Sequence, residues 1–341
     1  MRIFLTCSIK PEGAKGEKDI YAEFDSKETI DDLADAIKSN GHEVEILNVL
    51  GDIKDKLNSK KENIDLVFNV AEGLVGEERE AYVPKLCEEL KIPFTGASSW
   101  TAINTLNKGR TKEILNKKGI PTPKFRVVSD SEEDLSGLKF PLLVKPMFEG
   151  SSKGIFNENL VHDADNLKKI IKKTIARYNQ KVIVEEFIDG REFTVSVIGE
   201  KTILPIVEIL FDDLPDRLYP MDSYEVKWEH DSPESIEKKG YDPIVCPANI
   251  DNKLKIKIEE VVLATYKALK CHDWSRIDVR LDAKGNPNIL EVNALPGFMK
   301  NPKENSRLPK AAYANRWSYE RLIGEVINSA IKRMLKLQEN K

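Results

Sequence analysis

The chain has 341 residues, with 53 basic and 57 acidic side chains and 40% apolar residues. This length suggests two or three domains of ~150 residues each, and the balanced charge argues against a nucleic-acid partner held by bulk positive charge. No apolar run approaches the ~18 residues of a membrane span, and the start turns polar too soon for a signal peptide, so we expect a cytoplasmic protein without a membrane partner. Four cysteines without a CxxC spacing and four scattered histidines predict reduced thiols and no zinc site.

The first hundred residues alternate predicted strands and helices. Three apolar runs predict strands at residues 2–7, 44–47 and 65–70. Between the first two strands, apolar residues at helical spacing predict a helix that buries Ile30, Leu33, Ala34 and Ile37. Asp25 and Glu28 can form a capping box before this helix, and Gly41 suits its end. A helix over 77–90 and a short strand at 92–95 follow, and the repeated strand–helix–strand units imply a parallel sheet with right-handed crossovers.

The remaining chain contains a second α/β module and a hairpin. A basic helix over 108–118 ends before Pro121 and Pro123, which cannot continue it, so we place a domain boundary nearby. The next predicted elements are strand 140–145, helix 163–178, strand 182–187, helix 252–269, a hairpin at 276–293 and a final helix from 318. Residues 211–243 are acidic and show no sustained period, which predicts a long ordered loop of a usually functional kind, and 296–309 is predicted to be irregular.

The predicted hairpin carries acidic residues on one polar face. If the turn lies at 284–285, Asp278 faces Glu291 directly across the strand pair. Side chains alternate along a strand, so Arg276 and Asn293 lie on the same face. Opposed carboxylates repel unless a cation intervenes, and an all-oxygen set of Asp278, Glu291 and Asn293 suits Mg²⁺. The alternative is an exposed hairpin whose acids face solvent or pair with arginines, and an odd-length turn would destroy the assumed register.

A lysine at a strand end and a glycine-serine loop are candidates for phosphate binding. Lys145 follows an apolar run and precedes a proline, which places its ammonium at the carboxyl end of a strand, where α/β sheets bind ligands. The loop at 149–154, Glu-Gly-Ser-Ser-Lys-Gly, supplies small residues, backbone N–H groups and hydroxyls that can close over phosphates. It does not match the GxxxxGK[ST] P-loop, and such a loop can equally be a plain connection.

Together these segments resemble the ATP-grasp fold and, specifically, the D-alanine–D-alanine ligase family, from about residue 68 to residue 327. The motifs that carry the resemblance are Val144-Lys145-Pro146, Glu149-Gly150-Ser151-Ser152, Val184-Glu185-Glu186-Phe187, Glu192-Phe193-Thr194-Val195, Arg276-Ile277-Asp278-Val279, and Glu291-Val292-Asn293 with Pro296-Gly297. The resemblance implies an α/β (α+β) ATP-grasp fold with an N-terminal parallel-sheet preATP-grasp domain. It divides the chain into that domain at 1–105, a central subdomain at 106–200, and a C-terminal subdomain at 201–341 with a mobile loop at 211–243.

The resemblance also implies roles for individual residues. On the nucleotide these are Lys108 and Lys145 at the ATP phosphates, Ser151 and Ser152 closing over them, Glu185, Glu186, Phe187 and Ile188 lining the adenine pocket, and Glu192 at the ribose. Asp278, Glu291 and Asn293 match the family's ligands for two Mg²⁺ ions, for which Mn²⁺ can substitute. The catalytic set is Arg276 at the transition state, the Gly297 N–H at the developing oxyanion, and Lys227 of the mobile loop at the γ-phosphate.

The site for the first substrate departs from the family pattern. The family holds that substrate's ammonium with an early acidic-serine motif, and here only Glu23-Phe24-Asp25-Ser26 lies in that region. Asp25 is then a helix cap, a substrate ligand or both. Glu72 stands where the family has histidine, so it either binds a substrate cation or is a solvated loop acid.

The site for the second substrate also differs. Trp228 replaces a tyrosine of the mobile loop, and Ser306 corresponds to the serine that binds the carboxylate of the nucleophile. Lys300, Lys303 and Arg307 around it suggest a more anionic or larger acceptor, or they form an ordinary charged surface loop.

The expected function is an ATP- and Mg²⁺-dependent carboxylate–amine ligase that forms a peptide-like bond through an acyl phosphate, with D-alanine as one candidate substrate. One alternative is a ligase for a different amino acid or small peptide outside cell-wall synthesis. Others are a non-catalytic ATP-binding protein and an enzyme that forms the acyl phosphate without an amide. The resemblance implies small-molecule substrates and a homodimer.

Overall fold

The computed structural model describes residues 1–11, 21, 23–73, 76–304 and 306–339. Its first part is a parallel sheet, as predicted, with the order β2-β1-β3 and the bounds β1 Arg2–Cys7, β2 Glu43–Asn48 and β3 Leu66–Asn69. The helices are α1 Lys27–Ser39, α2 Ile53–Lys60, α3 Tyr82–Leu90 and α4 Ser99–Leu106, with short 3₁₀ turns at Lys61–Asn63 and Arg79–Ala81. Alternation along β1 places Leu5 in the core with α1 and Phe4 in a second core with α2 and α3.

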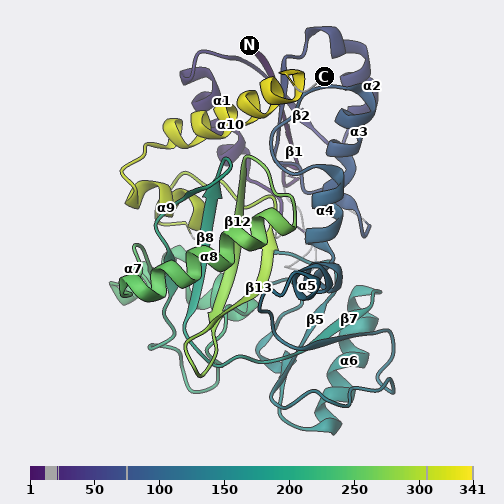
Figure 1. Cartoon of the computed structure of the whole chain (residues 1–341), viewed down its shortest axis with the longest axis vertical. Helices are drawn as coiled ribbons and strands as arrows, with labels where there is room; N and C mark the ends of the chain where they lie inside the picture. The colour runs from purple at the N-terminus through teal and green to yellow at the C-terminus, as the bar shows by residue number, and fades with distance from the viewer. Residues whose placement is uncertain (12–20, 22, 74–75, 305, 340–341) are drawn as a thin grey trace.

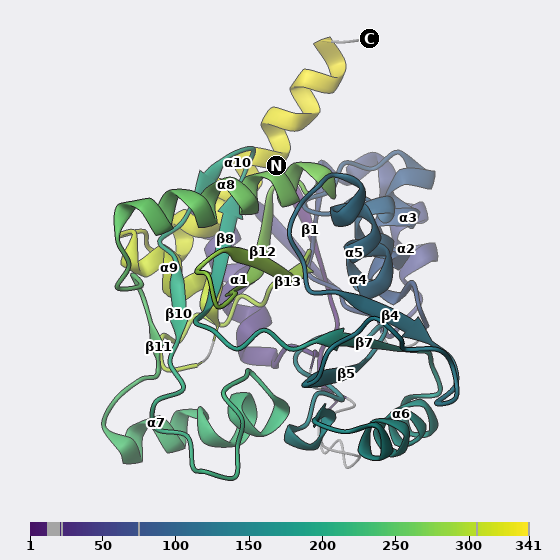
Figure 2. The same ribbon diagram turned by 60° about the horizontal axis from the view of Figure 1, so that its bottom comes forward.

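The central part is a four-stranded antiparallel sheet preceded by helix α5 Lys108–Lys117. Its order is β4-β7-β5-β6, with the bounds β4 Phe125–Val128, β5 Leu142–Pro146, β6 Leu160–Val161 and β7 Val182–Glu186. Helix α6 Ala164–Tyr178 packs on this sheet through its apolar face, which contributes Leu167 and Ile171 to the core (Figure 2). The predicted strands and helix are therefore confirmed.

The last part is built on a larger antiparallel sheet. Its order is β11-β10-β8-β12-β13 with β9 beside β8, and the bounds are β8 Glu192–Ile198, β9 Thr202–Ile203, β10 Val207–Ile209, β11 Ile244–Val245, β12 Trp274–Leu281 and β13 Pro287–Asn293. Helix α8 Asn252–Ala268 covers one face, and α9 Arg307–Ala314 and α10 Tyr319–Glu339 pack toward the N-terminal sheet (Figure 1). The central sheet ends with β7, and the last sheet begins with β8. The predicted domain borders near residues 105 and 200 remain predictions.

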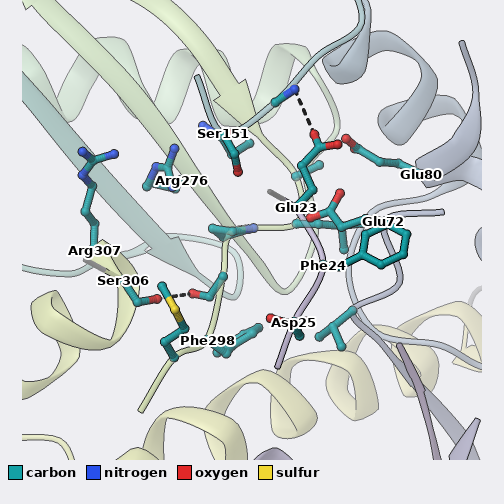
Figure 3. A pocket seen from close by; sticks show the side chains of 18 of the residues that line it. Glu23, Phe24, Asp25, Glu72, Glu80, Ser151, Arg276, Phe298, Ser306 and Arg307 are labelled. Carbon is teal, nitrogen blue, oxygen red and sulfur yellow. Dashed lines mark hydrogen bonds between the residues drawn. The ribbon is translucent and has the colours of Figure 1, made fainter. Parts of the chain in front are cut away.

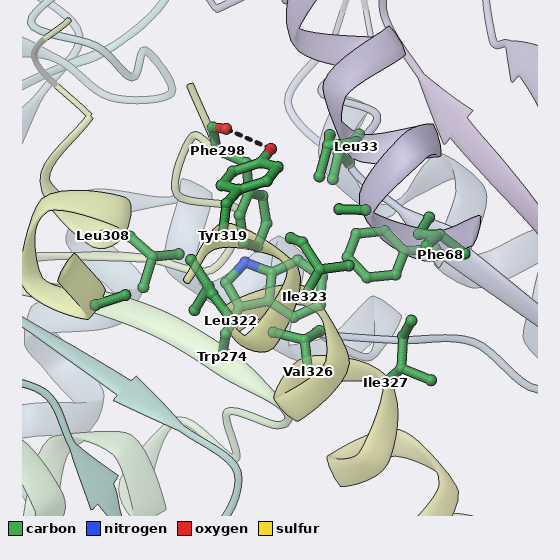
Figure 4. Close-up of a cluster of buried hydrophobic side chains, with 14 of the residues drawn as sticks. Leu33, Phe68, Trp274, Phe298, Leu308, Tyr319, Leu322, Ile323, Val326 and Ile327 are labelled. Carbon is green, nitrogen blue, oxygen red and sulfur yellow. Dashed lines mark hydrogen bonds between the residues drawn. The ribbon is translucent and has the colours of Figure 1, made fainter. Parts of the chain in front are cut away.

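An aromatic cluster joins the first and last sheets into one core. The rings of Phe68 and Trp274 stack with centroids 5.8 Å apart, and Phe298 packs against both (Figure 4). Gly96 (φ +83°) makes this packing possible, because a Cβ there would lie 2.8 Å from the Trp274 ring. The two sheets are therefore held in a defined relation, and the cavities described below lie between them and the central sheet.

Several local predictions are corrected by the structure. Ser26, not Asp25, caps α1, because its Oγ accepts the Thr29 N–H at 3.0 Å while the Asp25 backbone pairs with the end of β1. The helix predicted over 77–90 begins as a 3₁₀ turn and becomes α-helical only at 82. The strand predicted at 92–95 is a single bridge between Val67 and Phe94.

Two segments predicted to be irregular contain helices. Within 211–243, a π-helix spans Val226–His230, and α7 spans Pro233–Lys239 with the Ser232 hydroxyl as its N-cap. Helix α9 begins at Arg307 and so includes the end of the segment predicted to be irregular. These helices are too short to show a sustained apolar period, which explains why the pattern missed them. None of the helices in the described residues is both long and apolar enough to cross a membrane.

Candidate active site

The β12–β13 hairpin brings the predicted metal ligands to one face. Asp278 pairs with Glu291 and Arg276 pairs with Asn293, so the predicted pairing is confirmed. The predicted two-residue turn is wrong, because the ladder ends at Leu281 and its partner, leaving a five-residue loop at 282–286. The Asp282 carboxylate stabilises this loop by accepting the N–H groups of Lys284 and Asn286.

A β-bulge restores the predicted register. The pairing shifts between Asp278 and Val279, where Leu290 of β13 has no direct partner. One extra residue reverses the side-chain alternation, so it compensates for the odd length of the loop. The carboxylates of Asp278 and Glu291 therefore face each other despite the unexpected turn.

Asp278 lies in a dense polar network. Its Oδ1 accepts hydrogen bonds from the Thr194 hydroxyl and from Arg276 Nε at 3.1 Å, and its Oδ2 accepts from the Arg276 guanidinium and the Asn293 amide, both at 3.0 Å. Burial raises the pKa of Asp278, but Arg276 and the hydrogen bonds outweigh it and hold that pKa well below its usual range. The group is ionised, and with Glu291 and Asn293 it forms an all-oxygen donor set that fits Mg²⁺ or Mn²⁺.

A cavity of about 60 Å³ lies between the central sheet and β8–β12. It collects most of the residues predicted to bind nucleotide: Lys145, Ser152, Glu185, Glu186, Phe187, Ile188 and Glu192, together with Asp278 and Glu291. Glu185 pairs with Lys145 and, at 2.8 Å, with Lys112. Burial alone would raise the pKa of Glu185, but the two lysines lower it to about 2, so the carboxylate keeps Lys145 charged at the cavity. Burial raises the pKa of Glu192 to about 7, against the effect of Arg280 at 3.3 Å.

A larger cavity of about 430 Å³ (Figure 3) shares Glu291 with the first cavity in its lining. It is lined by the other predicted site residues: Asp25, Glu72, Lys108, Ser151, Lys227, Trp228, Arg276, Asn293, Gly297 and Ser306. The fold therefore brings every predicted site residue to one of two connected cavities.

The segment at 211–243 lies over the glycine-serine loop. Trp228 donates from its indole nitrogen to the Ser151 carbonyl at 3.0 Å, and the Ser152 hydroxyl donates to the Asp222 carbonyl at 2.8 Å. Ser151 and Ser152 have φ values of +51° and +60°, so this loop is held in a left-handed conformation that serine seldom adopts. Burial, with help from Arg307, lowers the pKa of Lys227 to about 8.

The sequence did not reveal an ion pair that joins three segments of the site. Arg79 donates to both carboxylate oxygens of Glu23, at 2.8 and 2.9 Å, and to the Phe148 carbonyl at 2.6 Å. The same carboxylate accepts the Gly150 N–H at 2.9 Å. Glu23 and Arg79 are 56 residues apart, and Arg79 lies in a charged run that is typical of a solvated helix face, so no local signal could have paired them.

Of the three extra cations near Ser306, only one lies in the cavity. Arg307 is 2% exposed, lines the cavity and donates to Asp222 at 2.8 Å. Lys300 instead lies among surface acids, with its Nζ 3.6 Å from Asp32, and Lys303 is exposed. The prediction of a cationic acceptor site is therefore restricted to Arg307.

The larger cavity is strongly polarised. Arg276 and Arg307 lie on one side, and Glu23, Glu72 and Glu80 lie on the other (Figure 3). Burial raises the pKa of Glu80 to about 7 and raises that of Glu72 as well, because three carboxylates share this wall. Asp25, which does not cap helix α1, also lines the cavity, and burial raises the pKa of its carboxyl group to about 7. This arrangement suits a zwitterion that spans the two walls.

Lysines beside a cavity between two sheets, two opposed carboxylates on one face of a hairpin and a helical segment over the glycine-serine loop form the arrangement of the ATP-grasp class of ATP-dependent ligases. A family model described as D-ala D-ala ligase C-terminus matches residues 114–328. The chain belongs to the D-alanine–D-alanine ligase family, and it is an ATP-dependent carbon–nitrogen ligase.

Similar proteins agree with this assignment. The chain is 32% identical over 339 residues to a D-alanine–D-alanine ligase of Carboxydothermus hydrogenoformans, covering 96% of this chain and 97% of that one. It is 34% identical over 270 residues to the uncharacterized protein y4sG of Sinorhizobium fredii, covering 79% and 75%. Among solved structures, the D-alanine–D-alanine ligase from Bacillus anthracis complexed with ATP matches with a TM-score of 0.74 and 25% identity, covering 98% and 99%.

Proposed function

We propose that this protein uses ATP and Mg²⁺ to convert the carboxylate of an amino acid or small peptide into an acyl phosphate and then couples it to an amine, with D-alanine as one candidate substrate. The observation that carries the proposal is the position of Asp278, Glu291 and Asn293, which lie on one face of the β12–β13 hairpin where the nucleotide-side cavity meets the larger one. A phosphoryl group held there is within reach of a carboxylate in the larger cavity.

The nucleotide binds between the central sheet and β8–β12, with its base at the smaller cavity and its phosphates reaching the larger one, where Lys108, Ser151 and Lys227 lie. The ammonium groups of Lys108 and Lys145 contact its phosphates, and Lys145 is held charged and in place by Glu185. Ser151 and Ser152 close over the triphosphate through hydroxyls and backbone N–H groups. The adenine lies against the strand end at Glu185, Glu186, Phe187 and Ile188, and Glu192 receives the ribose.

The metal acids complete the phosphate site. Asp278, Glu291 and Asn293 would hold one or two Mg²⁺ ions, which supply positive charge to the terminal phosphates when bound. Arg276 has two tasks: it keeps Asp278 ionised, and it stabilises negative charge on the transferring phosphoryl group. Lys227 adds a further cation at the γ-phosphate.

Amide formation takes place at the second-substrate end of the larger cavity. Ser306 and Arg307 bind the carboxylate of the nucleophile, and Arg307 is oriented by Asp222. A neutral amine attacks the acyl phosphate, and the Gly297 N–H and Arg276 stabilise the oxygen of the tetrahedral intermediate. Collapse of that intermediate breaks the C–O bond to phosphate, and inorganic phosphate leaves with the amine proton, so that the amide remains. The segment at 211–243, which includes Trp228 and lies over the glycine-serine loop, excludes water, which would otherwise hydrolyse the acyl phosphate.

The test is a screen of D- and L-amino acids and dipeptides for ADP release with Mg²⁺ and ATP. We expect release to depend on an amino-acid substrate and to be accompanied by a new amide. If hydroxylamine traps the activated acid while no amine yields an amide, the protein makes only the acyl phosphate. Tight ATP binding without ADP release for any acid would contradict the ligase reaction itself.

The homodimer and the cytoplasmic location stay predictions that rest on the family and the sequence. Light scattering of the purified protein measures the first, and fractionation of the source cells measures the second. Replacement of Mg²⁺ by Mn²⁺ should support turnover because both ions accept an all-oxygen ligand set.

A further inference from the structure

Three carboxylates meet on the N-terminal wall of the larger cavity. Glu23, Glu72 and Glu80 each place an oxygen within 4.8 Å of the others (Figure 3). Glu23 is already satisfied, since both of its oxygens accept from Arg79 and one also accepts the Gly150 N–H. The charges that need a partner are therefore those of Glu72 and Glu80.

Glu80 is a buried carboxylate that faces the cavity without a partner. It is only 8% exposed, it lines the cavity, and its carboxylate points toward that of Glu23 (Figure 3). It makes no hydrogen bond, and no ion pair within 4 Å, to any residue that the structure describes. The guanidinium of the adjacent Arg79 contacts Glu23 and the Phe148 carbonyl instead. An unpaired buried carboxylate is costly, so a residue of this kind points to a cationic ligand.

The wall carries more acidic groups than the ammonium of one amino acid would pair with. Asp25 does not cap its helix, and its carboxylate also lines the cavity, without a hydrogen bond to the part of the chain that the structure describes. Asp25, Glu72 and Glu80 are thus three acids without an ion-pair partner within 4 Å among the residues that the structure describes, whereas an α-ammonium group supplies one positive charge. A second cationic group on the substrate would balance this wall.

An organic cation fits the wall better than a metal ion. The oxygens of Glu23 are occupied by Arg79, so a metal ion held within the group Glu23, Glu72 and Glu80 would find two unoccupied carboxylates, those of Glu72 and Glu80. The neighbouring guanidinium of Arg79 would also repel a divalent metal ion more strongly than a monovalent organic cation. The cavity of about 430 Å³ is within the range of small-molecule sites, so it has room for a side chain longer than a methyl group.

We propose that the acid activated by this enzyme carries a second ammonium or guanidinium group besides its α-ammonium, as a basic or diamino acid does, and that this group binds between Glu72 and Glu80. This inference rests on the proposed ligase function, and it names the class of the first substrate. The carboxylate of such a substrate would then point toward Arg276 and the phosphoryl site on the opposite wall.

The experiment compares matched pairs of amino acids in D and L forms: lysine with norleucine, and ornithine with norvaline. Binding is measured by titration calorimetry with ADP and Mg²⁺ present, and ADP release is measured separately with ATP. We expect at least one basic member to bind about tenfold tighter than its uncharged counterpart, as a charged hydrogen bond provides. Glu80→Gln and Glu72→Gln, which keep the side-chain shape, should each reduce this ratio several-fold.

Glu78→Gln is the matched control. Glu78 immediately precedes the same 3₁₀ turn, and its replacement by glutamine removes the same charge as Glu80→Gln. Unlike Glu80, however, Glu78 is exposed, pairs with Lys85 and does not line the cavity. The binding ratio in this variant should equal that of the unmodified protein.

The outcomes separate this inference from the function beneath it. Absence of any preference for a basic amino acid overturns the inference, even if uncharged acids give ADP release and the ligase function stands. Preferential binding without ADP release supports the inference and refutes the ligase reaction. Binding of Mg²⁺ or Ca²⁺ alone that Glu80→Gln abolishes would make the wall a metal site and overturn the inference.

Discussion

Replacement of Arg79 by methionine tests the ion pair that joins the N-terminal wall to the glycine-serine loop. The side chains of Arg79 and Glu23 are only 5% and 6% exposed, and the guanidinium holds both carboxylate oxygens and the Phe148 carbonyl. Methionine retains much of the volume but removes the charge and all three hydrogen bonds. Within the described part of the chain, Lys153, 3.6 Å away, is then the one cation left beside the buried Glu23 carboxylate.

The expected loss of folding free energy depends on how the buried Glu23 carboxylate is accommodated when Arg79 is absent. Breaking a buried ion pair costs about 3–5 kcal/mol of folding free energy. Folding with a neutral glutamate is the cheaper route, and protonating an ordinary glutamate at pH 7 costs about 3.7 kcal/mol. At pH 5 the same protonation costs only about 1 kcal/mol, so the loss of stability should be larger at pH 7 than at pH 5.

Urea-induced unfolding at both pH values measures this loss. We expect Arg79→Met to lower the free energy of unfolding by about 3–5 kcal/mol at pH 7, whereas Arg110→Met, at an exposed position of α5, should change it by under about 0.5 kcal/mol. In a Glu23→Gln background the cost of Arg79→Met should fall, because no charge is left unpaired. A loss under about 1 kcal/mol at pH 7, or one that does not shrink at pH 5, would show that the pair is solvated and refute the reasoning.

The remaining predictions concern catalysis. Asp278→Asn should reduce turnover by at least about a hundredfold while circular dichroism stays unchanged, and full activity would remove the metal assignment. Lys145→Ala should weaken ATP binding by about tenfold or more, as measured by fluorescent-nucleotide displacement. Glu185 keeps Lys112 at 2.8 Å as an ion-pair partner in this variant, so it is not left as an unpaired buried charge. Unchanged affinity for ATP would count against the contact of Lys145 with the phosphates. Because burial lowers the pKa of Lys227 to about 8, its ammonium is present below that pH, so kcat/KM for ATP should fall as the pH rises through 8. Lys227→Arg should move this fall to higher pH, and a flat profile to pH 9.5 would contradict the role.

The hairpin shows how a sequence can predict a site through an incorrect detail. The alternation of polar and apolar residues correctly placed Asp278 and Glu291 on one face, because the period of a strand is two. The turn was misplaced, and the bulge at Leu290 restored the face that the turn would have lost. A bulge leaves no mark in a single sequence, because it depends on what each strand packs against.

The acidic wall shows the opposite case. Asp25 and Glu72 were singled out from their positions, yet their environment depends on Arg79 and Glu80, which the sequence offered only as members of a charged run. The contacts between 23, 79 and 150 join residues that are 56 and 127 positions apart. Periodicity and capping report interactions over a few residues, so they carry no information about such pairs.

By itself, the sequence determined the order and type of most elements, the parallel N-terminal sheet, and the chemistry-bearing residues that gather in the two cavities. The elements and the sheet follow from local rules, because apolar spacing, proline and glycine act within a few residues of the chain, whereas most of the residues in the cavities were indicated by the resemblance to the ligase family. Only the tertiary structure decided which charges are paired and which are left open. That outcome depends on burial and on contacts between distant segments, and it is why Glu23 is satisfied by Arg79 while Glu80, on the same wall, has no hydrogen-bond or ion-pair partner among the described residues.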